Sequence, residues 1–190
     1  MLNQYIDLSL TKHITQSQLP TGYSTLLDHD DYMTLRISQL KNCTLSITKM
    51  FQEVSPDNIL HRCVILNDDN GTAYIAAFIE IYLENLPLDV RETLIHSNKP
   101  LGKILIERNI HPKFSNRKYL LTKRECILVP YLRDCIKMNH LYGRFHSLLT
   151  ASGEKIADVH EFVTHMERDA VNQVPSVRSM PTERKQEVVT

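Results

Sequence analysis

The stretch from residue 59 to residue 83 constrains the fold most, because two apolar runs are joined there by a strong turn signal. Residues 59–67 and 72–83 are rich in aliphatic side chains, and Asp68-Asp69-Asn70-Gly71 separates them. An Asn-Gly pair between such runs predicts a β-hairpin, since both residues tolerate the backbone angles of a tight turn. The second strand is long and mostly apolar, so it is expected to be central in a sheet.

Arg62 occupies a position in this hairpin where an aliphatic side chain is expected. With a period of two, Arg62 shares one strand face with Leu60, Val64 and Leu66, and both faces of the strand are apolar. The side chain is therefore expected to point inward. A guanidinium keeps its proton even when buried, so it requires a carboxylate, a ligand anion or trapped water beside it.

Glu161 is the candidate counter-charge. In the run 155–163 it shares a face with Ala157, Val159 and Val163, which is as apolar as the face that holds Arg62. Two arrangements are open. If both faces look into one cavity, the site suits a small ligand that is anionic and hydrophobic. The alternative is a buried structural ion pair of Arg62 with Glu161 and nothing between them.

The remaining elements follow from periodicity and turn residues. Asp30 and Asp31 precede the second helix of a short helix pair. Pro56-Asp57-Asn58 closes a strand, and Ala151-Ser152-Gly153-Glu154 is the turn of a second hairpin. The sequence predicts helices near residues 25–27, 32–40, 88–97 and 103–108, strands near 43–50, 118–123, 126–129, 142–150 and 155–163, and a short helix or loop over 131–138.

Pro100-Leu101-Gly102 interrupts the two helices predicted after residue 87. The backbone N–H groups that open the second helix are free to bind an anion there. The alternative is a simple corner between two helices.

Composition fits one globular domain with flanking segments. The chain has 190 residues, of which 42% are hydrophobic, so a sizeable core is available. We expect a lightly ordered lead-in over residues 1–23, a domain over 24–168, and a flexible tail over the polar, proline-containing residues 169–190. Such a lead-in is too short to hold a DNA-binding helix-turn-helix.

Charge indicates which classes of partner to expect, and cysteine content indicates the cellular compartment. The 22 basic and 22 acidic residues balance, which gives no overall field to attract nucleic acid or a membrane surface. The four cysteines are widely spaced, and neither a leader peptide nor a membrane-spanning run is visible. A cytoplasmic protein with reduced thiols is expected, without nucleic-acid or membrane partners.

Several familiar sites are disfavoured. His160, Glu161 and His165 miss the spacing of a zinc helix by one residue and lie in a predicted strand. The acidic cluster Asp28-His29-Asp30-Asp31 lacks the spaced ligands of a calcium loop and is expected to be a solvated, helix-capping cluster. With five glycines in the chain, no glycine-rich nucleotide loop is present.

The order of these motifs resembles the chorismate pyruvate-lyase family, in a divergent branch. The matching stretches run from about residue 25 to 165 and are Asp31-Tyr32-Met33-Thr34, Thr44-Leu45-Ser46-Ile47-Thr48, Arg62-Cys63-Val64-Ile65-Leu66 with Gly71, Pro100-Leu101-Gly102-Lys103-Ile104-Leu105, Tyr142-Gly143-Arg144 with Ser152-Gly153, and Glu161-Phe162. The segment 109–141 is longer than in the compact bacterial enzyme, and the spacing from Gly143 to Glu161 is wider.

The resemblance implies a fold and an activity. The fold is α+β, with a single antiparallel sheet, helices packed around it and an internal ligand cavity. The activity is cleavage of chorismate to 4-hydroxybenzoate and pyruvate without a metal or an organic cofactor. Arg62 would bind a carboxylate and stabilise the departing enolpyruvate, and Glu161 would act as a general acid/base or hydrogen-bond the ring hydroxyl. Met33 and Leu101, with Gly102, would bind substrate through main-chain groups.

Two other functions remain open from the sequence. One is a non-catalytic domain that binds an aromatic carboxylate, because the effector-binding domains of some transcription regulators resemble the lyase fold. The other is a structural or interaction protein in which Arg62 and Glu161 only form a buried pair.

Overall fold

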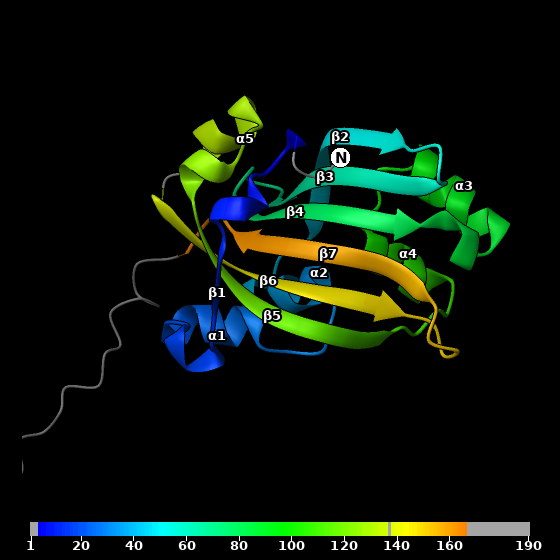
Figure 1. Ribbon diagram of the computed structural model, residues 1–190, viewed down its shortest axis with the longest axis horizontal. Helices are drawn as coiled ribbons and strands as arrows, with labels where there is room; N and C mark the ends of the chain where they lie inside the picture. The colour runs from blue at the N-terminus through cyan, green and yellow to red at the C-terminus, as the bar shows by residue number, and fades with distance from the viewer. Residues whose placement is uncertain (1–3, 137, 167–190) are drawn as a thin grey trace, which may run out of the picture.

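The computed structural model describes residues 4–136 and 138–166. The tail predicted for residues 169–190 lies outside that range. Within it, one seven-stranded antiparallel sheet carries helices around it (Figure 1), which confirms the expected α+β architecture. No helix among these residues has the length and apolar character needed to cross a membrane.

The strands run in the order β1-β5-β6-β7-β4-β3-β2 across the sheet. Their bounds are β1 Lys12–Ile14, β2 Leu45–Val54, β3 Ile59–Asp68, β4 Ala73–Tyr82, β5 Lys113–Lys123, β6 His140–Leu149 and β7 Lys155–Val163. The α-helices are α1 Thr21–Leu27, α2 Met33–Lys41, α3 Leu88–His96, α4 Leu101–Glu107 and α5 Pro130–Cys135. Short 3-10 helices are η2 Leu8–Leu10, η3 Gln16–Gln18, η4 Leu83–Asn85 and η5 Arg124–Cys126.

The predicted hairpins form the middle of the sheet. β3 and β4 are joined at Gly71, whose φ of 79° needs the conformational freedom of glycine. β7 returns from the second hairpin to pair with β4, so the two hairpins share one continuous sheet. Each face of this sheet has its own core because the central strands are apolar on both sides.

Helices cover the face that carries Leu60, Val64 and Leu66. The larger apolar cluster joins these residues to α1, α2, α3 and α4, and Figure 1 shows α2 and α4 behind the sheet. The opposite face carries Cys63 and Ile65 and is partly covered by the N-terminal segment and α5. The period-two assignment of β3 is therefore correct.

Two segments differ from the expectations. The lead-in contributes the edge strand β1, which pairs with residues 119–121 of β5. Residues 126–129 were predicted as a strand piece, but Cys126 ends η5 and, of residues 127–129, only Ile127 forms an isolated bridge, to Ile6. A turn forms there because the N–H of Ile127 donates back to the carbonyl of Arg124, which directs the chain away from the sheet.

The strand register aligns side chains in rows across the helix-covered face. One row is Arg62, Ile79, Val159 and His146, on β3, β4, β7 and β6. The adjacent row on the same face is Val64, Ala77, Glu161 and Arg144. The first row thus has a polar residue at each end and aliphatic residues between them, whereas the second row has its two polar residues side by side at the β6 end.

Candidate functional site

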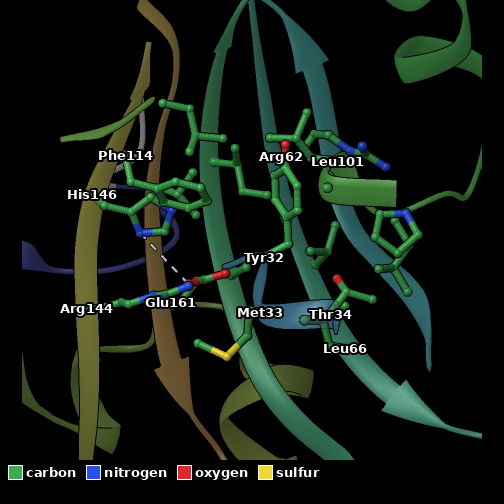
Figure 2. A pocket seen from close by; sticks show the side chains of 18 residues that line it. Tyr32, Met33, Thr34, Arg62, Leu66, Leu101, Phe114, Arg144, His146 and Glu161 are labelled. Atoms are coloured by element: carbon green, nitrogen blue, oxygen red, sulfur yellow. Dashed lines mark hydrogen bonds and ion pairs between the residues drawn. The ribbon is translucent and has the colours of Figure 1, made fainter. Parts of the chain in front are cut away.

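A cavity lies over these two rows, between the sheet and the N-terminal ends of α2 and α4 (Figure 2). It encloses about 530 Å³ free of protein atoms, counted with its opening to solvent, and the centre of a water molecule can reach about 50 Å³ of this space. A molecule that fits within this space is compact. Its lining is Tyr32, Met33, Thr34, Ile47, Arg62, Val64, Leu66, Ala77, Ile79, Pro100, Leu101, Gly102, Phe114, Arg144, His146, Leu148, Val159 and Glu161.

The five residues predicted as a site all line this one cavity. They are Met33, Arg62, Leu101, Gly102 and Glu161. Met33 opens α2 and Leu101 opens α4, so the first turns of both helices border the cavity. Gly102 permits this arrangement, because a Cβ there would lie 2.7 Å from the ring of Tyr32.

Arg62 is buried without a counter-charge. Its side chain is 2% exposed, and its Nε and Nη2 atoms have no hydrogen-bond partner among the described residues. No carboxylate in that part of the chain lies within ion-pair distance of the guanidinium. Burial lowers the pKa of Arg62 to about 10, so the group is still charged at neutral pH.

Glu161 binds a different arginine. Its Oε2 accepts a hydrogen bond from Nε of Arg144 at 2.7 Å, and both side chains are almost fully buried. The suggested buried pair of Arg62 with Glu161 is therefore wrong. Arg144 stands directly opposite Glu161 in the β6–β7 register, whereas Arg62 lies two strands away.

Arg144 also fixes the loop between α1 and α2. Its Nη1 donates to the carbonyls of Leu27 and His29 at 3.3 and 2.9 Å, and its Nη2 donates to the carbonyl of Asp31 at 3.2 Å. Arg144 is thus fully partnered, in contrast to Arg62. Because this loop leads directly into α2, the Arg144–Glu161 pair determines where one wall of the cavity stands.

A second arginine holds the same loop from outside. Arg117 donates to the carbonyl of His29 at 2.7 Å and forms ion pairs with Asp28 and Asp30. Tyr119 donates to the same Asp28 carboxylate, and these hydrogen bonds lower the pKa of Asp28. The acidic cluster was predicted to cap a helix, but no side chain caps α2, whose N-cap residue is Tyr32. Arg117 instead engages the carboxylates of Asp28 and Asp30.

His146 is the site residue that sequence reasoning missed. It is 3% exposed, lines the cavity beside Phe114, and its Nδ1 lacks a partner in the described chain. Glu161 Oε2 lies 4.0 Å from Nδ1, too far for a hydrogen bond. Burial, and then the charge of Arg144, lower the pKa of His146 well below its ordinary value, so the imidazole is neutral. Alternation along the strand predicts that Arg144 and His146 share one face.

No group of three or more His, Cys, Asp or Glu side chains that could bind a metal ion occurs in the described part of the chain. His160 and Glu161, adjacent in β7, project to opposite faces of the sheet. His160 packs on Phe145 instead, with ring centroids 4.8 Å apart.

Comparisons with known proteins find solved structures of similar fold. No family model and no curated protein sequence matches the chain. PhnF from Mycobacterium smegmatis matches with a TM-score of 0.56 and 9% identity, over 72% of this chain and 64% of that one. The chain thus spans less than two thirds of that structure. The effector domain of PhnF alone matches with a TM-score of 0.52 and 10% identity, over 70% of this chain and 88% of that domain.

A GntR-family transcriptional regulator from Enterococcus faecalis V583 is more distant, with a TM-score of 0.48 and 12% identity over 65% of this chain and 100% of that one. At identities this low, the likeness establishes the fold alone.

These findings correct the lyase assignment. The fold is similar to that of PhnF and its effector domain, which contradicts membership of the chorismate pyruvate-lyase family. The predicted enzyme class and the chorismate, 4-hydroxybenzoate and pyruvate chemistry are wrong with it. The matching residues lie around the cavity and at the hairpins, where a shared fold is sufficient to explain them. The expectation of no nucleic-acid partner rested on the balance of charge alone, and these comparisons do not bear it out.

Proposed function

We propose that this chain is a ligand-binding domain whose cavity binds a small anion with an apolar body and does not turn it over. The observation that carries the proposal is Arg62, a charged guanidinium with two unpartnered nitrogens facing a cavity. An uncompensated buried charge is strongly unfavourable, so a structure retains one where a ligand completes it. An anion supplies both the charge and the acceptors.

The surroundings of Arg62 support a small organic anion such as an aromatic carboxylate. The floor of the cavity is aliphatic, with Ile79 and Val159 between its polar ends. The first turn of α2 offers further N–H groups at Met33 and Thr34, where no side chain caps the helix. Leu101 and Gly102 of α4 border the cavity on the Arg62 side (Figure 2).

Likeness to the effector domain of PhnF supports a regulatory use of such binding. A sensor must bind its ligand and change conformation in response, and it need not catalyse a reaction. The hydrogen bonds from Arg144 to the α1–α2 loop connect the cavity to the surface. Ligand occupancy would be read out through the position of that loop.

Calorimetry with benzoate, with the neutral isostere benzamide as the control ligand, tests the proposal. Benzoate is expected to bind and benzamide to bind far more weakly. Arg62→Met should weaken benzoate binding about tenfold to a hundredfold, because a charge-assisted hydrogen bond contributes about 1.5–3 kcal/mol. Arg108→Met removes the same charge from an exposed ion pair with Asp89 and should leave the affinity unchanged.

Equal affinity of the wild-type protein and Arg62→Met for benzoate would contradict the role of Arg62. Failure of the wild-type protein to bind benzoate or inorganic phosphate at millimolar concentration would contradict the anion-binding function itself.

A further inference from the structure

His29 lies in the loop between α1 and α2, and both nitrogens of its ring contact backbone groups on either side of it. Nε2 lies 2.8 Å from the carbonyl oxygen of Leu26, and Nδ1 accepts a hydrogen bond from the N–H of Asp31 at 3.1 Å. A carbonyl oxygen only accepts, so Nε2 carries the hydrogen and Nδ1 carries the lone pair. The geometry therefore requires a neutral imidazole in a single tautomer.

Protonation of His29 is incompatible with this arrangement. A proton on Nδ1 replaces the lone pair with a second N–H group, which then faces the N–H of Asp31. It also places a positive charge beside Arg144, whose Nη1 lies 3.4 Å from Nε2. Burial, and then the charge of Arg144, lower the pKa of His29 to about 4, so the ring is neutral at pH 7.

Other titratable groups face the ring from the neighbouring elements. They are Arg144 and His146 on β6, Glu161 on β7, Arg36 on α2 and Arg117 on β5, with the carboxylates of residues 28, 30 and 31 in the loop itself. Glu161 favours a protonated ring, but its carboxylate already binds Nε of Arg144. The surroundings therefore keep His29 neutral, as its two contacts with the backbone require.

The segment that His29 fixes leads directly into the wall of the cavity. Asp31 is followed by residues 32–34, which all line the cavity and include the start of α2. Arg144 holds the loop against the sheet through its carbonyl groups. His29 instead joins the two ends of the loop to each other, so it determines how far the first turn of α2 lies from the end of α1.

We propose that His29 is a positioning residue for the anion site: its neutral ring joins the end of α1 to the start of α2 and so holds the first turn of α2 at the cavity. The inference rests on the proposed function, because the position of that turn affects a ligand only if the cavity binds one. His29 does not itself line the cavity. It acts on the ligand through the loop, and acid should release that loop.

Calorimetry with benzoate at pH 7 tests the role of His29 in binding. His29→Phe keeps a ring of similar size and removes both nitrogens, so the loop is closed in a smaller fraction of the molecules. The apparent affinity falls with that fraction, and a loss of about tenfold is expected. His29→Asn should recover most of the affinity, because its Oδ1 takes the place of Nδ1 and accepts from the N–H of Asp31.

His96→Phe is the matched control. His96 is a histidine on α3, outside the loop, and its Nε2 lies 3.3 Å from a carboxylate oxygen of Glu92. The substitution therefore removes an imidazole with a polar partner, as His29→Phe does. The variant should bind benzoate with the affinity of the wild-type protein.

Amide hydrogen exchange tests the same role without a ligand. An open loop exposes the ring and returns its pKa from about 4 to about 6.5, so protonation favours opening as the pH falls below 6.5. Between pH 7 and 5, the protection factor of the Asp31 N–H should fall about tenfold in the wild-type protein, with allowance for the partial exposure of His29. It should stay constant in His29→Asn, which does not titrate. The N–H of Arg91, bonded to the carbonyl of Pro87 in α3, is the internal reference.

The outcomes separate the two proposals. Equal affinity of the wild-type protein and His29→Phe for benzoate overturns the inference, while binding at Arg62 stands. No binding of benzoate to the wild-type protein overturns both. If His29→Phe does not fold, the wild-type protein decides. Its imidazole ¹⁵N resonances at pH 7 should place the proton of His29 on Nε2. A proton on Nδ1, or a protection factor at Asp31 that falls no more than that at Arg91, overturns the inference.

Discussion

Two buried arginines in one cavity have opposite roles, and their difference is a property of single residues. Arg144 has a carboxylate and three backbone carbonyls as partners, whereas two nitrogens of Arg62 have none. The same substitution at each position therefore has opposite expected consequences for stability.

Arg144→Met should destabilise the protein by about 3–5 kcal/mol, because it leaves Glu161 as an uncompensated buried charge. Arg62→Met should leave the free energy of unfolding unchanged or raise it, because it removes a charge that has no partner in the empty cavity. Urea denaturation of both variants measures these changes. A loss at Arg62 as large as that at Arg144 would show that Arg62 is a structural residue.

The titration of His160 predicts how stability depends on pH. Burial lowers the pKa of this imidazole to about 4, against about 6.5 in the unfolded chain. The unfolded state therefore binds more protons below pH 6.5, and stability is lost as the pH falls from about 6.5 towards 4. When the pH falls from 7 to 5, the free energy of unfolding of His160→Phe should decrease by about 1 kcal/mol less than that of the wild-type protein. This figure allows for the partial exposure of the His160 side chain. Equal losses in urea denaturation would contradict the assignment.

At the scale of single residues, alternation along the strands predicted correctly that Arg62 is buried and that Glu161 lies among aliphatic side chains. The suggested pairing of Glu161 with Arg62 was wrong, although the turn predicted between Thr150 and Lys155 is sufficient to identify the correct partner. Pairing those two residues places Arg144 opposite Glu161 by simple counting along the hairpin. The hydrogen bonds of Arg144 to the α1–α2 loop cannot be counted in this way, because they depend on tertiary placement.

At the scale of elements, two glycines control how closely segments approach. A Cβ at Gly143 would lie 2.4 Å from the backbone carbonyl oxygen of Glu161, which cannot move without disturbing β7. Gly143→Ala should therefore destabilise the protein by about 3 kcal/mol, at the upper end of the usual range for overpacking. Thermal unfolding measures this, and a loss below about 1 kcal/mol would contradict the packing of β6 against β7.

Gly102→Ala should act on the cavity rather than on the sheet. The three atoms nearest to the added methyl group all belong to the side chain of Tyr32, at 2.7 to 2.9 Å. Because that ring can turn towards the cavity, we expect a smaller loss of stability than at Gly143 and a weaker affinity for benzoate. Calorimetry of the two variants in parallel separates the effects.

The hairpins and most helices were predictable because local turn residues and periodicity determine them. The segment 126–129 was not, since a short apolar run has no period that distinguishes a strand from a turn with buried side chains. η5 and the single bridge to Ile6 form there through contacts with the N-terminal segment, which the local sequence does not contain.

For the whole molecule, stability should be greatest where the two hairpins meet. β4 and β7 have neighbours on both sides and apolar residues on both faces, whereas β1 and β2 are edges. Amide hydrogen exchange should be slowest in residues 75–81 and 157–163 and fastest in β1. Addition of benzoate should increase protection in α2 and the α1–α2 loop but not in β1. An increase spread evenly over all strands would contradict readout through that loop.

The unpartnered charge of Arg62 also bears on how this protein evolves. In a lineage that still uses the ligand, selection for binding preserves the arginine despite the stability that it removes from the empty domain. In a lineage that has lost the ligand, nothing opposes its replacement by an aliphatic residue, and such a replacement is favoured because it stabilises the fold. The residue found at this position in a set of homologous sequences therefore reports which of them still bind an anion, before any of them is assayed.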